Sequence, residues 1–167
     1  VEAVSRLLDR FPDLRLAIVG DGPLRADLTD LAKRHNLERN IHFVGSVPNV
    51  ELPDYLRQAR IAVMPSVVAE SGDQEGLGLV AVEAMGCGCA VVASDLPAVR
   101  DTIIDGETGL MANPGDPADL AGKIAALLDD SELLTRLADN GRRHAIKHFD
   151  WRHVGDSYAE LLNRMLG

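Results

Sequence analysis

The run from Gly76 to Ala93 constrains the fold of this chain more than any other segment, because Glu83 is the only charged residue within it. Four glycines also interrupt the run, so it is a poor candidate for a membrane span. The pattern instead predicts a buried helix over 78–86 and a buried strand over 89–93, joined by a tight turn. Glu83 would then be a buried carboxylate, which is costly unless a partner binds it.

Short apolar segments alternate with amphipathic segments along the rest of the chain. Strands are predicted over 14–19, 41–44, 60–64, 89–93 and 109–111. Helices are predicted over 1–11, 24–35, 51–59, 78–86, 98–102, 116–128, 131–147 and 151–166. This alternation predicts an α/β fold, a Rossmann-like parallel sheet flanked by helices with further helices at the C-terminus. Trp151 and Tyr158 are expected to pack between helices.

Composition excludes several classes of function. The net charge of −9 argues against a nucleic-acid partner, which would need a basic face. Cys87 and Cys89 are the only cysteines, so a zinc site built from thiolates is not expected, and buried thiols in a reducing cytoplasm fit best. No signal peptide is visible. A small phosphorylated ligand remains compatible with an acidic protein, because backbone amides alone can bind phosphate.

The loops that follow the predicted strands are expected to form one cleft. They are the loops 20–23, 45–49, 65–76 and 94–97. In parallel sheets of this kind ligands lie beyond the carboxyl ends of the strands.

The glycines of Gly76-Leu77-Gly78 stand at the predicted start of the helix over 78–86. Free N–H groups at a helix N-terminus, without side chains in the way, make an anion site. The alternative is that these glycines only allow the helix to pack closely on the sheet.

Glu75 and Glu83 stand eight positions apart on either side of this helix start. In a continuous helix they would be about 12 Å apart along the axis, near the span of a nucleoside-diphosphate sugar from ribose to hexose. Glu83 would bind the ribose hydroxyls and Glu75 the hydroxyls of the sugar. The alternative is that Glu75 is solvated and that Glu83 bonds to a neighbouring backbone group.

The sequence Gly20-Asp21-Gly22-Pro23 follows a predicted strand and invites comparison with the dinucleotide fingerprint G-x-G-x-x-G. The comparison fails because Arg25 occupies the third glycine position. A tight strand-to-helix turn that approaches a ligand is the better interpretation, and a turn with no ligand is the alternative.

Several further landmarks occur in one order along nearly the whole chain. They are Val19-Gly20-Asp21-Gly22-Pro23, Phe43-Val44-Gly45-Ser46-Val47, Met64-Pro65-Ser66, the pair Glu75 and Glu83, Gly88-Cys89-Ala90-Val91-Val92-Ala93, Asp105-Gly106-Glu107-Thr108-Gly109-Leu110 and Phe149-Asp150-Trp151. As a set they resemble the C-terminal, nucleotide-sugar donor-binding domain of a retaining GT-B glycosyltransferase of family 4, also called glycosyl transferases group 1.

The resemblance implies a site and a reaction. Glu83 would bind the ribose, and Glu75, as the residue at the reacting sugar, would be the catalytic candidate. The other residues that the resemblance places at the donor are Gly20, Gly22, Val47, Pro65, Ser66, Gly76, Leu77, Gly78 and Leu79. A hexose would pass with retention from a UDP-, GDP- or ADP-sugar to a glycan or lipid-linked acceptor, without a cofactor or divalent metal. The implied location is the cytoplasm, with peripheral association with the inner face of the membrane as an alternative.

The chain also departs from the family pattern. Three features of the family would lie upstream of Val1. They are an Arg and a Lys that bind the diphosphate, the first strand, which is central in the sheet, and an N-terminal acceptor domain. We therefore expect residues 1–167 to be a single donor-binding domain truncated at its N-terminus, inactive alone and weak in donor binding. Either upstream residues complete the sheet, or the strands over 14–19 and 60–64 rearrange. The loop 69–74 is longer than the simplest family pattern, which leaves open which acid there contacts the sugar.

Two other hypotheses remain open. One is a nucleotide-sugar-binding module without transferase activity, such as an epimerase-like relative. The other is a generic Rossmann dinucleotide binder, which Arg25 and the lack of an acid at the end of the second strand disfavour.

Overall fold

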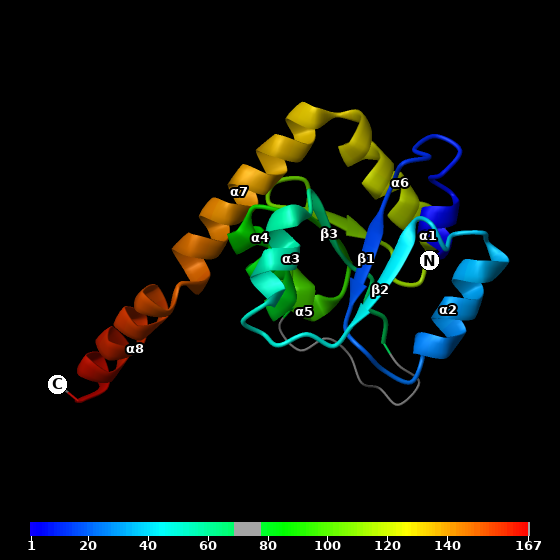
Figure 1. The fold of residues 1–167 in the computed structure, drawn as a ribbon. Coiled ribbons are helices and arrows are strands. Elements are labelled where there is room, and N and C mark those ends of the chain that lie inside the picture. The colour runs from blue at the N-terminus through cyan, green and yellow to red at the C-terminus, as the bar shows by residue number, and fades with distance from the viewer. Residues whose placement is uncertain (69–77, 167) are drawn as a thin grey trace.

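The computed structural model describes residues 1–68 and 78–166 of the 167-residue chain (Figure 1). In these residues the strands are β1 (Leu16–Val19), β2 (Ile41–Gly45), β3 (Ile61–Met64), β4 (Ala90–Ser94) and β5 (Leu110–Ala112). The helices are α1 (Glu2–Ser5), α2 (Arg25–Arg34), α3 (Leu52–Gln58), α4 (Leu79–Cys87), α5 (Pro97–Arg100), α6 (Pro117–Asp129), α7 (Ser131–Phe149) and α8 (Trp151–Leu166). The strand pairs β1–β2, β3–β4 and β4–β5 are all parallel. The α/β architecture expected from the alternating pattern is confirmed.

The first helix is shorter than predicted and ends at Ser5 rather than near Phe11. The Leu7 N–H donates to the Val4 carbonyl, so the chain continues in tight turns instead of further helical turns. The side chains of Val4 and Leu7 are nevertheless both buried.

The strands form two sheets rather than one. Sheet order is β1–β2 in one and β3–β4–β5 in the other, with no strand pairing between them among the described residues. A cavity of about 520 Å³ lies between the sheets, and its lining includes all of β1 together with Val63 of β3. The strands over 14–19 and 60–64 therefore do not pair with each other in the described residues.

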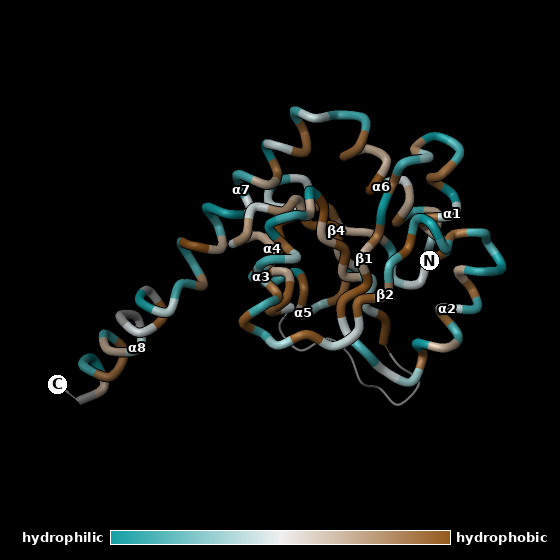
Figure 2. Tube along the Cα trace, in the orientation of Figure 1, coloured by the Kyte–Doolittle hydropathy of each residue, from teal (hydrophilic) through white to brown (hydrophobic). Residues whose placement is uncertain are grey.

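The core is centred on β4, whose residues Ala90, Val91, Val92 and Ala93 are all 0% exposed. Successive side chains of a strand point to opposite faces of its sheet. Accordingly Val91 and Ala93 belong to the apolar cluster with α3, α4 and α7, whereas Ala90 and Val92 belong to the cluster with α1, α6 and α7. Figure 2 shows the hydrophobic residues gathered along the strands and the hydrophilic ones along the outer helices.

The helix α8 projects away from the rest of the chain (Figure 1). Trp151 is 87% exposed and Tyr158 is 65% exposed, so the expectation that they pack between helices is wrong for the described residues. Among the helices that the structure describes, none combines the length and the apolar character that crossing a membrane requires.

Candidate functional site

The carboxyl ends of strands from both sheets meet at the cavity between them. Val19 at the end of β1, Pro65 directly after β3, Ser94 at the end of β4 and Asn113 directly after β5 all line it. Of the four loops predicted to form one cleft, 65–76 and 94–97 thus each contribute a residue to this cavity, whereas its lining includes no residue of 20–23 or 45–49. Of the residues predicted to bind a donor, the structure places Pro65 at this cavity and Ser66 next to it in the chain.

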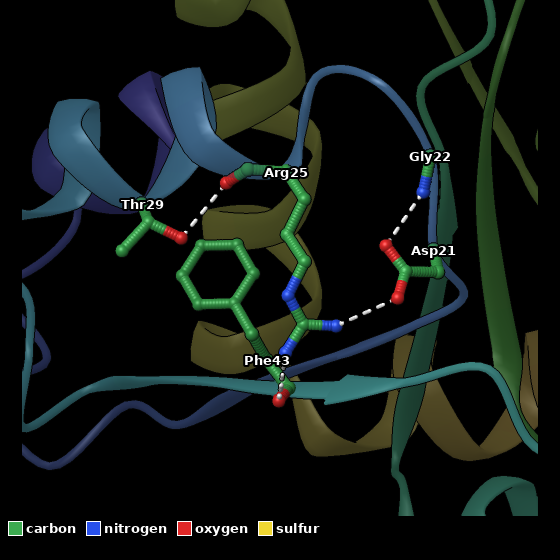
Figure 3. Close-up of polar contacts among 5 residues, drawn as sticks. All are labelled: Asp21, Gly22, Arg25, Thr29 and Phe43. Atoms are coloured by element: carbon green, nitrogen blue, oxygen red, sulfur yellow. Dashed lines mark hydrogen bonds and ion pairs between the residues drawn. The ribbon is translucent and has the colours of Figure 1, made fainter.

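The turn after β1 lies directly beside the end of β2. The Gly20 N–H donates to the Gly45 carbonyl at 2.8 Å, and both glycines have positive φ angles, 124° and 88°. Side chains rarely adopt such angles, so glycine is required at both positions. The Asp21 carboxylate accepts a hydrogen bond from the Gly22 N–H at 2.8 Å, which holds the turn (Figure 3). Gly20 and Gly22 are thus brought to the end of β2, from which Val47 follows two residues after Gly45.

Arg25 crosses between these two segments, a role that the sequence did not reveal. One Nη atom lies 3.3 Å from the Asp21 carboxylate, and the other donates to the Phe43 carbonyl of β2 at 3.5 Å (Figure 3). A Cβ atom on Gly45 would lie 3.0 Å from the guanidinium, so the arginine passes close to this glycine. The signal available in the sequence was the arginine at the third fingerprint position, which indicated only that the fingerprint fails.

The start of α4 is formed by Gly78, which has a left-handed conformation with φ of 64°. It is buried, and a Cβ atom there would lie 3.3 Å from the Thr102 Oγ1 atom. This glycine therefore allows close packing, but against α5 and the residues after it rather than against the sheet as the alternative had it. Glu75, Gly76 and Leu77 lie outside the described residues, so the predicted anion site at this helix start stays a prediction.

Glu83 is exposed, so the interpretation of it as a buried carboxylate is wrong. The helix α4 packs inward through Ala81, Ala84 and Met85, each at most 1% exposed. Leu79, which is 58% exposed, lies on the opposite side of the helix. Glu83 follows four residues later and therefore lies on the same side as Leu79. Because Glu83 lies about one helical turn after Leu79, it stands on the open side of α4 at the middle of this nine-residue helix.

The landmark from Asp105 to Leu110 builds structure rather than a ligand site. The Asp105 carboxylate accepts from the Met111 N–H at 2.8 Å, and the Thr108 hydroxyl accepts from the Ile104 N–H at 2.8 Å. A Cβ atom on Gly109 would lie 2.9 Å from the Val91 carbonyl oxygen. These contacts hold the turn that leads into β5 against β4.

The loop after β4 contains an ion pair that the sequence did not indicate. Arg100 binds Asp95 through two hydrogen bonds, of 2.6 and 3.0 Å. This bonding lowers the pKa of Asp95 and raises that of Arg100. In the described part of the chain, no three His, Cys, Asp or Glu side chains gather in a way that could hold a metal ion.

Comparison with known proteins gives this site its context. The family model described as "Glycosyl transferases group 1" matches residues 1–144. The GDP-mannose-dependent alpha-(1-6)-phosphatidylinositol monomannoside mannosyltransferase of Mycolicibacterium smegmatis is 34% identical over 164 residues, covering 98% of this chain and 43% of that protein. The chain thus spans less than half the length of this relative.

Solved structures agree with the family match. Sucrose-phosphate synthase from Thermosynechococcus elongatus superposes with a TM-score of 0.82 at 30% identity, covering 99% of this chain and 42% of that one. Anabaena HepE in complex with UDP-glucose superposes with a TM-score of 0.84 at 25% identity, covering 98% and 43% of the two chains. The chain therefore belongs to the glycosyl transferases group 1 family and has the fold of a GT-B glycosyltransferase C-terminal domain.

Proposed function

We propose that this chain is the part of a hexosyltransferase that binds the nucleoside-diphosphate sugar donor. The observation that carries the proposal is the place of Glu83, exposed on the open side of α4 about one helical turn after the helix start, in a member of this family. Support for the donor class comes from a relative whose name includes GDP-mannose dependence and from a solved neighbour with bound UDP-glucose.

In this proposal the exposed Glu83 carboxylate accepts hydrogen bonds from the ribose hydroxyls. An exposed carboxylate is within reach of a ligand, and the hydrogen bonds that it accepts are charge-assisted. The N–H groups at the start of α4, from Gly78 and Leu79, would face the diphosphate, where a helix N-terminus favours negative charge. Glu75, Gly76 and Leu77 complete the proposed site outside the described residues.

The turn at Gly20 and Gly22 and the segment at Val47 would border the nucleotide, with Pro65 and Ser66 beside the sugar-diphosphate. Glycine at the turn lets the backbone approach a ligand closely. The donor could carry uracil, guanine or adenine.

The proposed reaction transfers the hexose with retention of configuration at its anomeric carbon and needs no divalent metal. Cationic side chains and a helix N-terminus would take up the charge of the leaving diphosphate. The whole protein would also contain an acceptor-binding N-terminal domain and the diphosphate-gripping cations. Its acceptor would be a glycan or a lipid-linked sugar, in the cytoplasm or at the inner face of the membrane.

Titration of the ¹⁵N-labelled chain with UDP-glucose, GDP-mannose, ADP-glucose and NAD, followed by NMR, tests the donor proposal. At least one nucleotide sugar should shift amide signals of α4 and of the turn at Gly20 and Gly22. Glu83→Gln should weaken this binding at least about tenfold, because hydrogen bonds to a charged group contribute roughly 1.5–3 kcal/mol. Glu132→Gln in the first turn of α7 is the matched control and should bind like the wild type.

Two results would count against the proposal. Binding of NAD but of no nucleotide sugar would reject a donor site and favour the dinucleotide hypothesis. Binding of a nucleotide sugar that Glu83→Gln leaves unchanged would remove Glu83 from the site while retaining the donor class.

A further inference from the structure

We propose that Asp105 and Asp119 close the outer edge of β5, and that without them this edge pairs with β5 of a second copy of the chain. Among the described residues, β5 is the last strand of the three-stranded sheet and pairs only with β4. A strand at the edge of a sheet presents unpaired backbone groups that another chain can bind. Neither aspartate takes part in the proposed donor site.

The hydrogen bonds of β5 show which of its backbone groups face outward. The Ala112 carbonyl accepts from the Asp95 N–H at 2.8 Å, so Ala112 faces β4. Because the backbone groups of a strand alternate in direction, Met111 and Asn113 face away from β4. This outer edge borders a cavity of about 600 Å³, whose lining includes Met111, Asn113 and both aspartates. Space next to the edge is therefore available to another strand.

Both outward N–H groups are bound by carboxylates. The Met111 N–H donates to the Asp105 Oδ1 atom at 2.8 Å, and the Asn113 N–H donates to the Asp119 Oδ2 atom at 2.7 Å. A strand that approached this edge would find both donors occupied, and its own carbonyl groups would meet carboxylate oxygens. Charged side chains are one of the means by which proteins protect their strand edges.

Local structure does not require these two aspartates. The turn before β5 is already held by the hydrogen bond from the Gly106 N–H to the Gly109 carbonyl at 2.8 Å. The helix α6 already has a capping residue in Asp116, whose carboxylate accepts from the N–H groups of Ala118 and Asp119. The two edge carboxylates come from different elements, the turn and α6, yet both bind the outer edge of β5.

A second copy of the chain fits the opened edge because the edge is complementary to itself. Residues that lie opposite each other in an antiparallel pair can exchange both of their backbone hydrogen bonds. Around a two-fold axis, Met111 of one copy would lie opposite Asn113 of the other, and each N–H would donate to the opposite carbonyl. Asp105 blocks one of these bonds and Asp119 blocks the other. The pairing would be weak, since β5 has three residues.

The test is a concentration series of the ¹⁵N-labelled chain followed by NMR, with the mass measured by sedimentation equilibrium. The proteins are the wild type, Asp105→Ala, Asp119→Ala and the double variant. In the double variant the amide signals of residues 110–113 should shift as the concentration rises, and the mass should approach twice that of the monomer. These signals should stay constant in the wild type and shift less in the single variants.

Two further double variants separate the possible causes. Asp105→Asn with Asp119→Asn removes both charges but keeps an acceptor oxygen at each position, so it should behave like the wild type. Asp116→Ala with Asp130→Ala is the matched control, because it removes two carboxylates that cap the starts of α6 and α7. It loses the same charge and also frees backbone N–H groups, so its signals at 110–113 should stay constant.

Constant signals at 110–113 in the double alanine variant would overturn the proposal, and so would concentration-dependent shifts confined to another surface such as α8. Equal shifts in the double asparagine variant would also overturn it, because the hydrogen bonds to the N–H groups would then not be what closes the edge. If the double alanine variant does not fold, the two single variants decide by the same criterion, since each opens one N–H group.

Discussion

The carbonyl oxygen of Thr108 lies only 2.8 Å from the position that a Cβ atom on Gly141 would occupy. The Met85 side chain lies 3.1 Å from the same position. Gly141 is a glycine inside the long helix α7, where glycine is normally unfavourable. The close approach explains its presence, because it lets α7 pack against both the turn before β5 and the helix α4.

Gly141→Ala should therefore lower the free energy of unfolding by about 1–3 kcal/mol, the range for overpacking a dense interior. Gly122 in α6 is a matched control, because a Cβ atom there would meet no atom within 4 Å. Gly122→Ala should raise the free energy of unfolding by about 0.5–1 kcal/mol, since alanine favours a helix more than glycine does. Urea unfolding followed by circular dichroism measures both changes. A Gly141→Ala protein as stable as the wild type would show that α7 shifts without cost.

The two cysteines should differ sharply in reactivity. Cys89 is 0% exposed, and its Sγ atom donates to the Leu56 carbonyl at 3.0 Å. Burial raises the pKa of the Cys89 thiol to about 11, with a smaller contribution from Cys87. The thiolate is the reactive form, so at pH 8 only about one Cys89 thiol in a thousand is ionised.

Ellman's reagent should consequently label the folded protein at Cys87, which is partly exposed, and spare Cys89. Cys87→Ser should leave almost no fast-reacting thiol until urea unfolds the chain, whereas Cys89→Ser should keep the fast phase. Rapid labelling of the folded Cys87→Ser protein would contradict the buried position of Cys89.

His144 should make the protein less stable in mild acid. Burial lowers the pKa of His144, and the neighbouring His148 and Lys147 lower it further. The unfolded chain then takes up a proton at a higher pH than the folded chain does. Stability should rise with pH across the interval from the lowered pKa of folded His144 to its ordinary value of about 6.5.

His144→Gln should flatten this dependence, which urea unfolding at pH 5.0 and pH 7.5 measures. His148→Gln should move the pKa of His144 back toward its ordinary value in an NMR titration, because the neighbouring imidazole no longer repels the proton. No change in that pKa would rule out the contribution of His148 and leave burial and Lys147 as its causes.

Helices and strands could be predicted from the sequence because local apolar periodicity determines them. The strand over 89–93 was visible as an apolar run, and both of its faces are indeed buried. The same apolar run gave no sign that one side of α4 is exposed. Leu79 and Val80 are as apolar as Ala81 and Met85, so no periodic contrast marked which side of the helix would lie open. Glu83 was placed in the interior for that reason.

The local geometry of the candidate site could be predicted only where a short sequence pattern determines it. Gly20 and Gly22 were identified by their turn pattern, and the structure places them beside the end of β2. The role of Arg25 depends on Gly45, a residue 20 positions further along the chain, and the sequence alone does not reveal such a contact. Local periodicity likewise does not specify which strands pair, since strand order is a property of long-range pairing.

The cavity between the sheets also affects how cooperatively this chain unfolds. Hydrogen bonds between neighbouring strands normally make the strands unfold together. In the described residues no strand hydrogen bonds join β1 to β3. The β1–β2 sheet has its own apolar cluster around Val4, Leu37 and Ile41, and Leu14 is one of the few side chains that also contact the cluster around β4. Amide hydrogens of β1 should thus exchange with solvent when the β1–β2 sheet alone unfolds. Those of β4 should exchange only when the whole domain unfolds.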